Sequence, residues 1–215
     1  MKSDETLEYF KNLPSSLFTF DIPKSHQYSH LHNFENLYKE STDEFWKDLG
    51  DITKKLLDMD SLKTPKFVFL CGTPGSGKTH IAVGLYRAMV EKIGFASGGG
   101  VLFKPFMSMV ADIISGFSEN IPTRDALALY TKNKWLFLDD FSSSEKVFIK
   151  DSFEYQLFRD IALNRWDSGG TLITSTNLEA DALNRQFHGV FGEYVMSRLS
   201  DSFVINFPDQ DLRKK

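Results

Sequence analysis

The chain of 215 residues has a single cysteine, Cys71. A lone cysteine excludes an internal disulfide framework, and its place at the end of an apolar run predicts a buried thiol. No apolar run is long enough to cross a membrane. The acidic N-terminus, MKSDETLEYFKNL, lacks the apolar centre of a secretory signal. These absences predict a protein of the reducing cytoplasm that makes no contact with a membrane.

The chain also lacks an excess of basic residues. It carries 25 lysines and arginines against 29 aspartates and glutamates, a formal net charge of −4. That balance argues against a protein that coats nucleic acid through its overall charge, although it permits a local basic patch. With 41% apolar and 25% charged residues and no repeats, the sequence is typical of a globular domain with one sizeable core.

A glycine-rich motif follows the apolar run FVFLC at residues 67–71. The motif has the form G-x-x-x-x-G-K-T, which is the phosphate-binding P-loop, and consists of Gly72, Thr73, Pro74, Gly75, Ser76, Gly77, Lys78 and Thr79. A buried strand should lead into the loop, and a helix should begin at its end. Glycine-rich turns also occur without a ligand, but the complete motif between a strand and a helix favours nucleotide binding.

Each part of the motif has a chemical task. The glycines let the backbone turn so that its N–H groups face phosphate oxygens, and the new helix presents its positive end to the same anion. Lys78 should contact the β- and γ-phosphates of ATP, and the Thr79 hydroxyl should bind Mg²⁺.

Two carboxylates, Asp139 and Asp140, end a second apolar run, Trp135 to Leu138. In a P-loop protein, we expect Asp139 to hold Mg²⁺ beside Thr79 and Asp140 to orient or deprotonate the attacking water. Asp140 is one methylene shorter than glutamate, which predicts slow hydrolysis or completion of the site by a neighbour. The other interpretation is a pair of acidic residues in an ordinary turn.

Asn177 follows a third apolar strand, residues 171–175. Polar residues at the carboxyl ends of parallel strands face the ligand crevice of an open α/β sheet. Asn177 should therefore contact the γ-phosphate or the attacking water, unless it is only a turn residue.

The remaining chain alternates helical and strand patterns. We expect helices at about 42–58, from the P-loop to 93, at 105–130 with a break near Pro122, and at 146–166, and further strands at 101–103 and 203–207. The region around His26, His30 and His32 has no ligand cluster typical of a metal site, so we expect it to be solvated. We expect residues 1–30 to form a short segment that is flexible or binds a partner, with one ATPase domain over 31–215.

These motifs together resemble the AAA+ ATPases, and among them the DnaC/IstB group of helicase loaders and transposition helpers. The likeness covers about Asn33 to Arg213, and its further marks are Gly-Lys-Thr-His at 77–80, Thr-Ser-Thr-Asn at 174–177, Gly-Glu-Tyr-Val-Met-Ser-Arg-Leu at 192–199 and Asp-Leu-Arg at 211–213. The resemblance implies an α/β fold: a five-stranded parallel sheet of order 5-1-4-3-2 flanked by helices, with no C-terminal lid domain.

The resemblance also implies roles for residues outside the P-loop. His80 joins the nucleotide-binding set, and Arg213 becomes a sensor-2-like arginine near the nucleotide. Arg198 becomes an arginine finger that acts on ATP held by a neighbouring subunit, so the protein should self-associate. Arg165 is implied at the same interface. A DNA surface is implied on the segment from Lys104 and Phe106 to Arg124.

The implied function is an ATP- and Mg²⁺-dependent ATPase that assembles on single-stranded DNA and loads a DnaB-like replicative helicase. Four alternatives remain. A transposition helper of the IstB kind would prefer duplex DNA, and a DnaA regulator of the Hda kind would be expected to carry a lid. A small-molecule kinase would leave Arg198 and Asn177 unexplained, and a non-hydrolysing adaptor would only bind.

Overall fold

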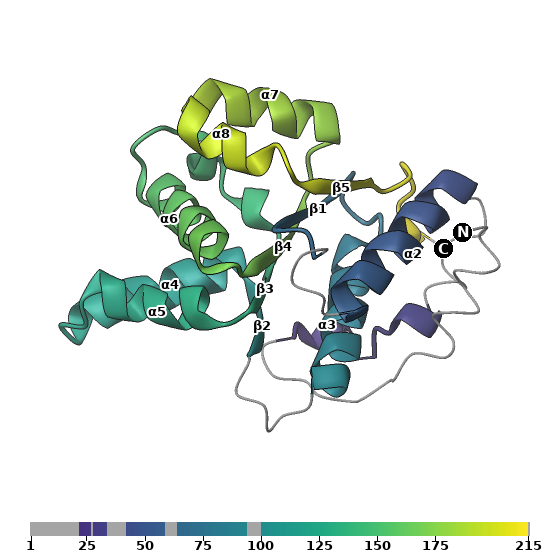
Figure 1. The fold of residues 1–215 in the computed structure, drawn as a ribbon, viewed down its shortest axis with the longest axis horizontal. Coiled ribbons are helices and arrows are strands. Elements are labelled where there is room, and N and C mark those ends of the chain that lie inside the picture. Colours follow the sequence, from purple (N-terminus) through teal and green to yellow (C-terminus); the bar gives the residue numbers. More distant parts are fainter. Residues whose placement is uncertain (1–21, 27, 34–41, 59–63, 94–99, 215) are drawn as a thin grey trace.

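The structure, a computed structural model, describes residues 22–26, 28–33, 42–58, 64–93 and 100–214. Its centre is one parallel sheet with the strand order β2-β3-β4-β1-β5 (Figure 1). The strands are β1 (Phe67–Cys71), β2 (Val101–Pro105), β3 (Trp135–Asp139), β4 (Thr171–Thr176) and β5 (Phe203–Asn206). Read from the other edge, this is the expected order 5-1-4-3-2, so the predicted fold class is confirmed.

Helices cover both faces of the sheet (Figure 1). One face packs against α2 (Asp43–Asp58) and α3 (Lys78–Ile93). The other packs against α4 (Phe106–Ser118), α5 (Thr123–Lys132), α6 (Phe153–Ser168), α7 (Ala180–Val190) and α8 (Glu193–Leu199). Every residue of β1, β3 and β4 is buried. These three strands occupy the middle of the sheet, which explains their nearly continuous apolar sequences.

The helix expected over 146–166 begins later and ends at Ser168. A 3-10 turn, Glu145–Phe148, comes first, and α6 starts only at Phe153. The Ser152 hydroxyl caps the helix by accepting a 3.1 Å hydrogen bond from the Tyr155 backbone N–H. Asp151, at φ 67°, turns the chain just before the cap. The N-cap residue Ser152 therefore sets the start of α6, although the apolar pattern before it would allow the helix to begin earlier.

The solvated interpretation of the histidine-containing segment is wrong for the two histidines that the structure describes in full. The side chain of His30 is buried, and its Nε2 lies 3.3 Å from Nη1 of the buried Arg87. Because a guanidinium only donates, His30 Nε2 accepts this bond. His26 is half-buried. Ile22 and Leu31 join the core beside α3, which holds the segment on the domain.

The expected boundary near residue 30 stays a prediction, since residues 1–21 lie outside the described part of the chain. Among the described helices, none is long and apolar enough to cross a membrane. Cys71 is buried, as predicted from its position.

Candidate nucleotide-binding site

The P-loop joins β1 to α3 at the carboxyl edge of the sheet. Three of its glycines have positive φ, with 147° at Gly72, 85° at Gly75 and 90° at Gly77. A Cβ on Gly75 would lie 2.1 Å from Asp211 Oδ1 and 2.8 Å from Arg213 Nε, so a larger residue would collide with the C-terminal segment. Glycine is needed here for backbone conformation and for space.

Lys78 begins α3 and folds back into the loop. Its Nζ donates to the Gly72 carbonyl at 2.8 Å, the Thr73 carbonyl at 2.7 Å and the Ser76 hydroxyl at 3.3 Å. All three acceptors are uncharged. Burial lowers the pKa of Lys78, and the nearby carboxylates of Asp140 and Asp139 oppose that change. A buried ammonium at a helix N-terminus suits a polyanionic ligand.

Thr79 and Asp139 meet across the crevice. The Thr79 hydroxyl lies 3.0 and 3.2 Å from the two carboxylate oxygens of Asp139. Burial raises the pKa of Asp139, while hydrogen bonds from Ser175 and Thr79 act in the opposite direction. A hydroxyl beside a buried carboxylate forms an all-oxygen donor pair, which fits Mg²⁺.

Asp140 and Asn177 also lie together, at the ends of neighbouring strands. Asn177 Nδ2 donates to Asp140 Oδ1 at 3.0 Å. Asp140 has φ 52° and ψ 51°, a left-handed conformation that aspartate tolerates better than most residues. Burial, and next the charge of Asp139, raise the pKa of Asp140. The amide holds a carboxylate whose environment favours proton uptake, as a general base requires.

One cavity of about 590 Å³ collects most of the expected site. Its lining includes Pro74, Gly75, Gly77, Lys78, Thr79, His80, Asp139, Asp140, Asn177 and Arg213. The other loop residues, Gly72, Thr73 and Ser76, do not line the cavity but accept hydrogen bonds from Lys78 Nζ. Arg213 reaches the loop while paired to Asp211, with Nε 2.9 Å from Oδ1. His80 Nε2 donates to the His30 carbonyl at 3.0 Å and to Asn33 Oδ1 at 2.8 Å.

Sequence reasoning missed four residues that line this cavity, Ser25, His26, Ser175 and Leu212. Ser25 and His26 line the cavity, and burial lowers the pKa of His26. Ser175 also lines it and bonds to both aspartates. Among these residues, only Ser175 could have been predicted from the sequence. A hydroxyl inside a buried strand needs a hydrogen-bond partner, and that need indicates a polar contact at this position.

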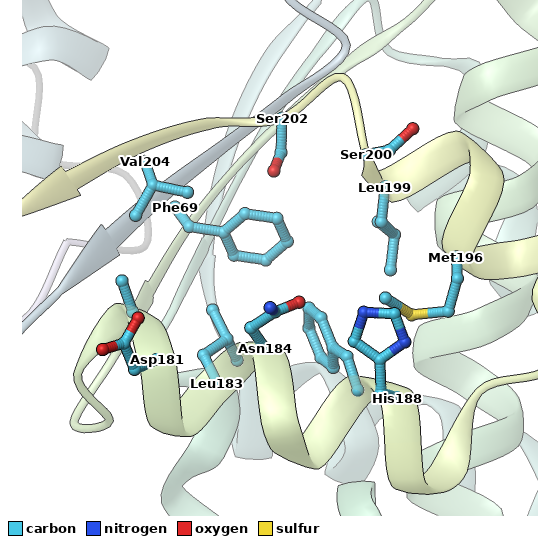
Figure 2. Close-up of a pocket in the computed structure, with 12 residues that line it drawn as sticks. Phe69, Asp181, Leu183, Asn184, His188, Met196, Leu199, Ser200, Ser202 and Val204 are labelled. Atoms are coloured by element: carbon cyan, nitrogen blue, oxygen red, sulfur yellow. The ribbon is translucent and has the colours of Figure 1, made fainter.

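Arg198 lies on α8, and it does not line the nucleotide cavity of its own chain. Its guanidinium carbon lies 3.6 Å from the centre of the Tyr194 ring, and Nη1 donates to the Tyr194 carbonyl at 2.9 Å. A separate hollow of about 340 Å³ lies between α7, α8 and β5, and residues of α8 on both sides of Arg198 line it (Figure 2). Figure 2 shows Phe69 from β1 and Met196 and Leu199 from α8 around that hollow.

Two expectations from the resemblance are wrong. Arg165 is fully buried, and it donates to the carbonyls of Tyr130, Lys134 and Thr171, so it is not on a subunit interface. Phe106 is also fully buried, so it has no face on which a base could stack. Lys104 is paired to Asp112 at 2.9 Å, and Arg124 is exposed.

Solved structures share this fold. No protein-family model matches the chain, and no curated protein matches it. The structure of the DnaC helicase loader matches with a TM-score of 0.66 and 18% identity over 86% of this chain and 99% of that one. DnaI matches with a TM-score of 0.57 and 14% identity over 82% of this chain and 89% of that one.

A third match is the replication initiator DnaA bound to AMPPCP and single-stranded DNA. It has a TM-score of 0.60 and 16% identity over 86% of this chain, which spans 50% of that DnaA chain. At these identities the likeness concerns the fold. The sheet order, the P-loop at its carboxyl edge and these matches together show that the chain has the parallel α/β P-loop fold of the DnaC, DnaI and DnaA structures.

Proposed function

We propose that this protein is an ATPase of the DnaC kind, which uses ATP and Mg²⁺ to assemble on single-stranded DNA and to load a DnaB-like replicative helicase. The observation that carries the proposal is the convergence of Lys78, Thr79, Asp139, Asp140 and Asn177 on one cavity. The likeness to a helicase loader over 99% of the loader's chain supports the choice among AAA+ functions.

The residues divide the work of phosphoryl transfer. Lys78 and the loop N–H groups bind the phosphates, while Thr79 and Asp139 would hold Mg²⁺, which would neutralise negative charge on the phosphates. Asp140, positioned by Asn177 at 3.0 Å, accepts a proton from the attacking water. Arg198, which does not line the cavity of its own chain, acts on ATP in a neighbouring subunit, so turnover depends on assembly and is slow without it.

The test of the function uses a helicase from the same cells. The tagged protein is mixed with ATP, a DnaB-like helicase and circular single-stranded DNA, and the helicase retained on DNA is measured after gel filtration. We expect retention that requires ATP and prefers single strands to duplex. A preference for duplex DNA, with a transposase as the partner, would instead identify a transposition helper. Helicase binding without any ATP turnover would identify an adaptor.

A further inference from the structure

A hollow of about 750 Å³ lies at the amino edge of the sheet, opposite the nucleotide cavity. Lys134 precedes β3, Gly170 precedes β4 and Lys66 precedes β1, and these three strands are neighbours. The hollow is therefore built by the residues just before three adjacent strands. Strands of five residues place it about 17 Å from the P-loop edge.

The lining of this hollow is basic and polar. Three lysines, Lys66, Lys132 and Lys134, contribute to it, and none of its described lining residues is acidic. Within the residues that the structure describes, no carboxylate pairs with any of these ammonium groups. Lys134 Nζ lies 4.5 Å from the centre of the Trp135 ring, a contact that leaves its charge in place. Three positive charges therefore gather here without a carboxylate partner on a chain whose net charge is −4.

A fourth cation lies beneath the hollow. Arg165 is fully buried, and its Nη2 lies 3.1 Å from where a Cβ on Gly170 would be. Its hydrogen-bond partners are backbone carbonyls, and no carboxylate of the described residues neutralises it. Burial lowers the pKa of Arg165 to about 10, which leaves the guanidinium charged at neutral pH. Its field adds to that of the three lysines.

The negative ends of the neighbouring helices are too weak to neutralise the positive charge of these four side chains. The C-termini of α5 and α6 both reach the hollow, and each carries about half a negative elementary charge. Two helix ends therefore neutralise about one of the four positive charges. Lys66 belongs to neither helix, yet its Nζ lies 3.4 Å from where a Cβ on Gly169 would be. The hollow keeps a net positive charge.

We propose that this hollow binds the phosphate backbone of nucleic acid, as a second contact beyond the assembly on single-stranded DNA proposed above. Its described lining offers ammonium groups, hydroxyls, amides and two glycines, but no apolar anchor and no exposed aromatic ring. A protein partner would need such an anchor, and base stacking would need the ring. Phosphates need only charge and polar donors, so the contact is independent of base sequence.

The test measures the salt dependence of DNA binding with the full chain and ATP. One triple variant is Lys66→Gln, Lys132→Gln, Lys134→Gln. The matched control is Lys47→Gln, Lys92→Gln, Lys150→Gln, which changes the net charge equally at exposed lysines elsewhere. We expect the slope of log affinity against log salt for a mixed-sequence single strand to fall by about 2 in the first variant only. Equal slopes in both variants would overturn the inference.

A second variant guards against loss of folding. Ser168→Asp places a carboxylate at the exposed rim of the hollow and keeps every lysine, so it should also weaken DNA binding. If the lysines only cap helices, the triple variant lowers the melting temperature while its salt slope stays that of the wild type, which contradicts the inference. Thermal melting of each variant separates these outcomes.

Competition identifies the kind of anion. Inorganic polyphosphate should displace the DNA from wild type more effectively than poly-glutamate at equal charge. More effective displacement by poly-glutamate would assign the hollow to an acidic protein segment and overturn the inference. ATP turnover and helicase retention are expected to persist in the triple variant. Their absence in wild type would refute the proposed function but leave the salt-slope result intact.

Discussion

The Ser175 hydroxyl joins Asp139 to Asp140: it donates to Asp139 Oδ1 at 2.6 Å and accepts from the Asp140 backbone N–H at 2.7 Å. Ser175 lies on β4, Asp139 ends β3 and Asp140 follows it, so this contact fixes the ends of two neighbouring strands relative to each other. One buried side chain therefore sets both the orientation of the expected Mg²⁺ ligand and the left-handed turn at Asp140.

Ser175→Ala should destabilise the protein by about 1–3 kcal/mol, because it removes the acceptor of the Asp140 N–H and one donor to a buried carboxylate. It should also raise the Mg²⁺ concentration needed for ATP binding. Urea unfolding and nucleotide titration at several Mg²⁺ concentrations measure the two effects. Ser118→Ala, at an exposed hydroxyl at the end of α4 and outside the nucleotide cavity, is the control. Wild-type values in both assays would mean that the Ser175 contact contributes neither to stability nor to Mg²⁺-dependent ATP binding.

Lys78→Ala should weaken ATP binding about tenfold to a hundredfold, because a charge-assisted hydrogen bond contributes about 1.5–3 kcal/mol. The fold should persist, since the partners of Lys78 Nζ are loop oxygens that water can reach once the side chain is truncated. Fluorescent-nucleotide titration and circular dichroism provide the measurements, with Lys150→Ala as the control. Unchanged affinity and turnover would refute the P-loop assignment.

Asp139→Asn and Asp140→Asn should impair different steps, ATP binding in the first variant and ATP hydrolysis in the second. The first should lose Mg²⁺-dependent ATP binding, because it removes the buried carboxylate that faces Thr79. The second should bind ATP normally but hydrolyse it about 10²–10⁴ times more slowly, since only the proton acceptor is lost. Parallel binding and turnover assays distinguish them. Wild-type turnover in Asp140→Asn would show that another group activates the water.

Arg198→Ala should bind ATP normally, assemble poorly on single-stranded DNA and hydrolyse ATP slowly. An arginine that acts fully on the transferred phosphoryl group contributes on the order of 10³–10⁵ in rate. A surface arginine that only stacks on Tyr194 would change the rate little. Turnover measured across a range of protein concentrations separates the two possibilities.

A mixing experiment provides the control for that prediction. Arg198→Ala keeps an intact P-loop and Lys78→Ala keeps an intact Arg198, so their mixture should recover activity at shared interfaces although each is inactive alone. If no mixture recovers activity and turnover does not depend on protein concentration, Arg198 does not act between subunits.

Cys71 should resist alkylation in the native protein. Burial raises the pKa of its thiol from 9.0 to about 12, so almost no thiolate is present at pH 8 to 9. Because the native pKa is raised, the thiol ionises first in the unfolded chain, and its contribution to stability is lost as pH rises from about 9 toward 12. Iodoacetamide labelling followed by mass spectrometry should be slow in buffer and fast in guanidinium. Rapid native labelling at pH 8 would contradict the burial.

Local sequence determined much of the fold and the centre of the site. The P-loop is contiguous, so Gly72 to Thr79 specify their own turn and the start of α3. The apolar runs before Asp139 and Asn177 specify buried parallel strands, whose carboxyl ends must share one edge. That rule was enough to bring Lys78, Asp139, Asp140 and Asn177 to one place.

Only the tertiary structure decided which side chains are buried and in which register the neighbouring strands pair. The expected strand order made β3 and β4 neighbours, but it did not give the register and the side-chain contact that set Ser175 against Asp139. Nor does it show that Arg165 is held by carbonyls from separate segments, or that His26 lines the nucleotide cavity. Such contacts join residues far apart in the chain, and the packing of helices on both faces of the sheet creates them.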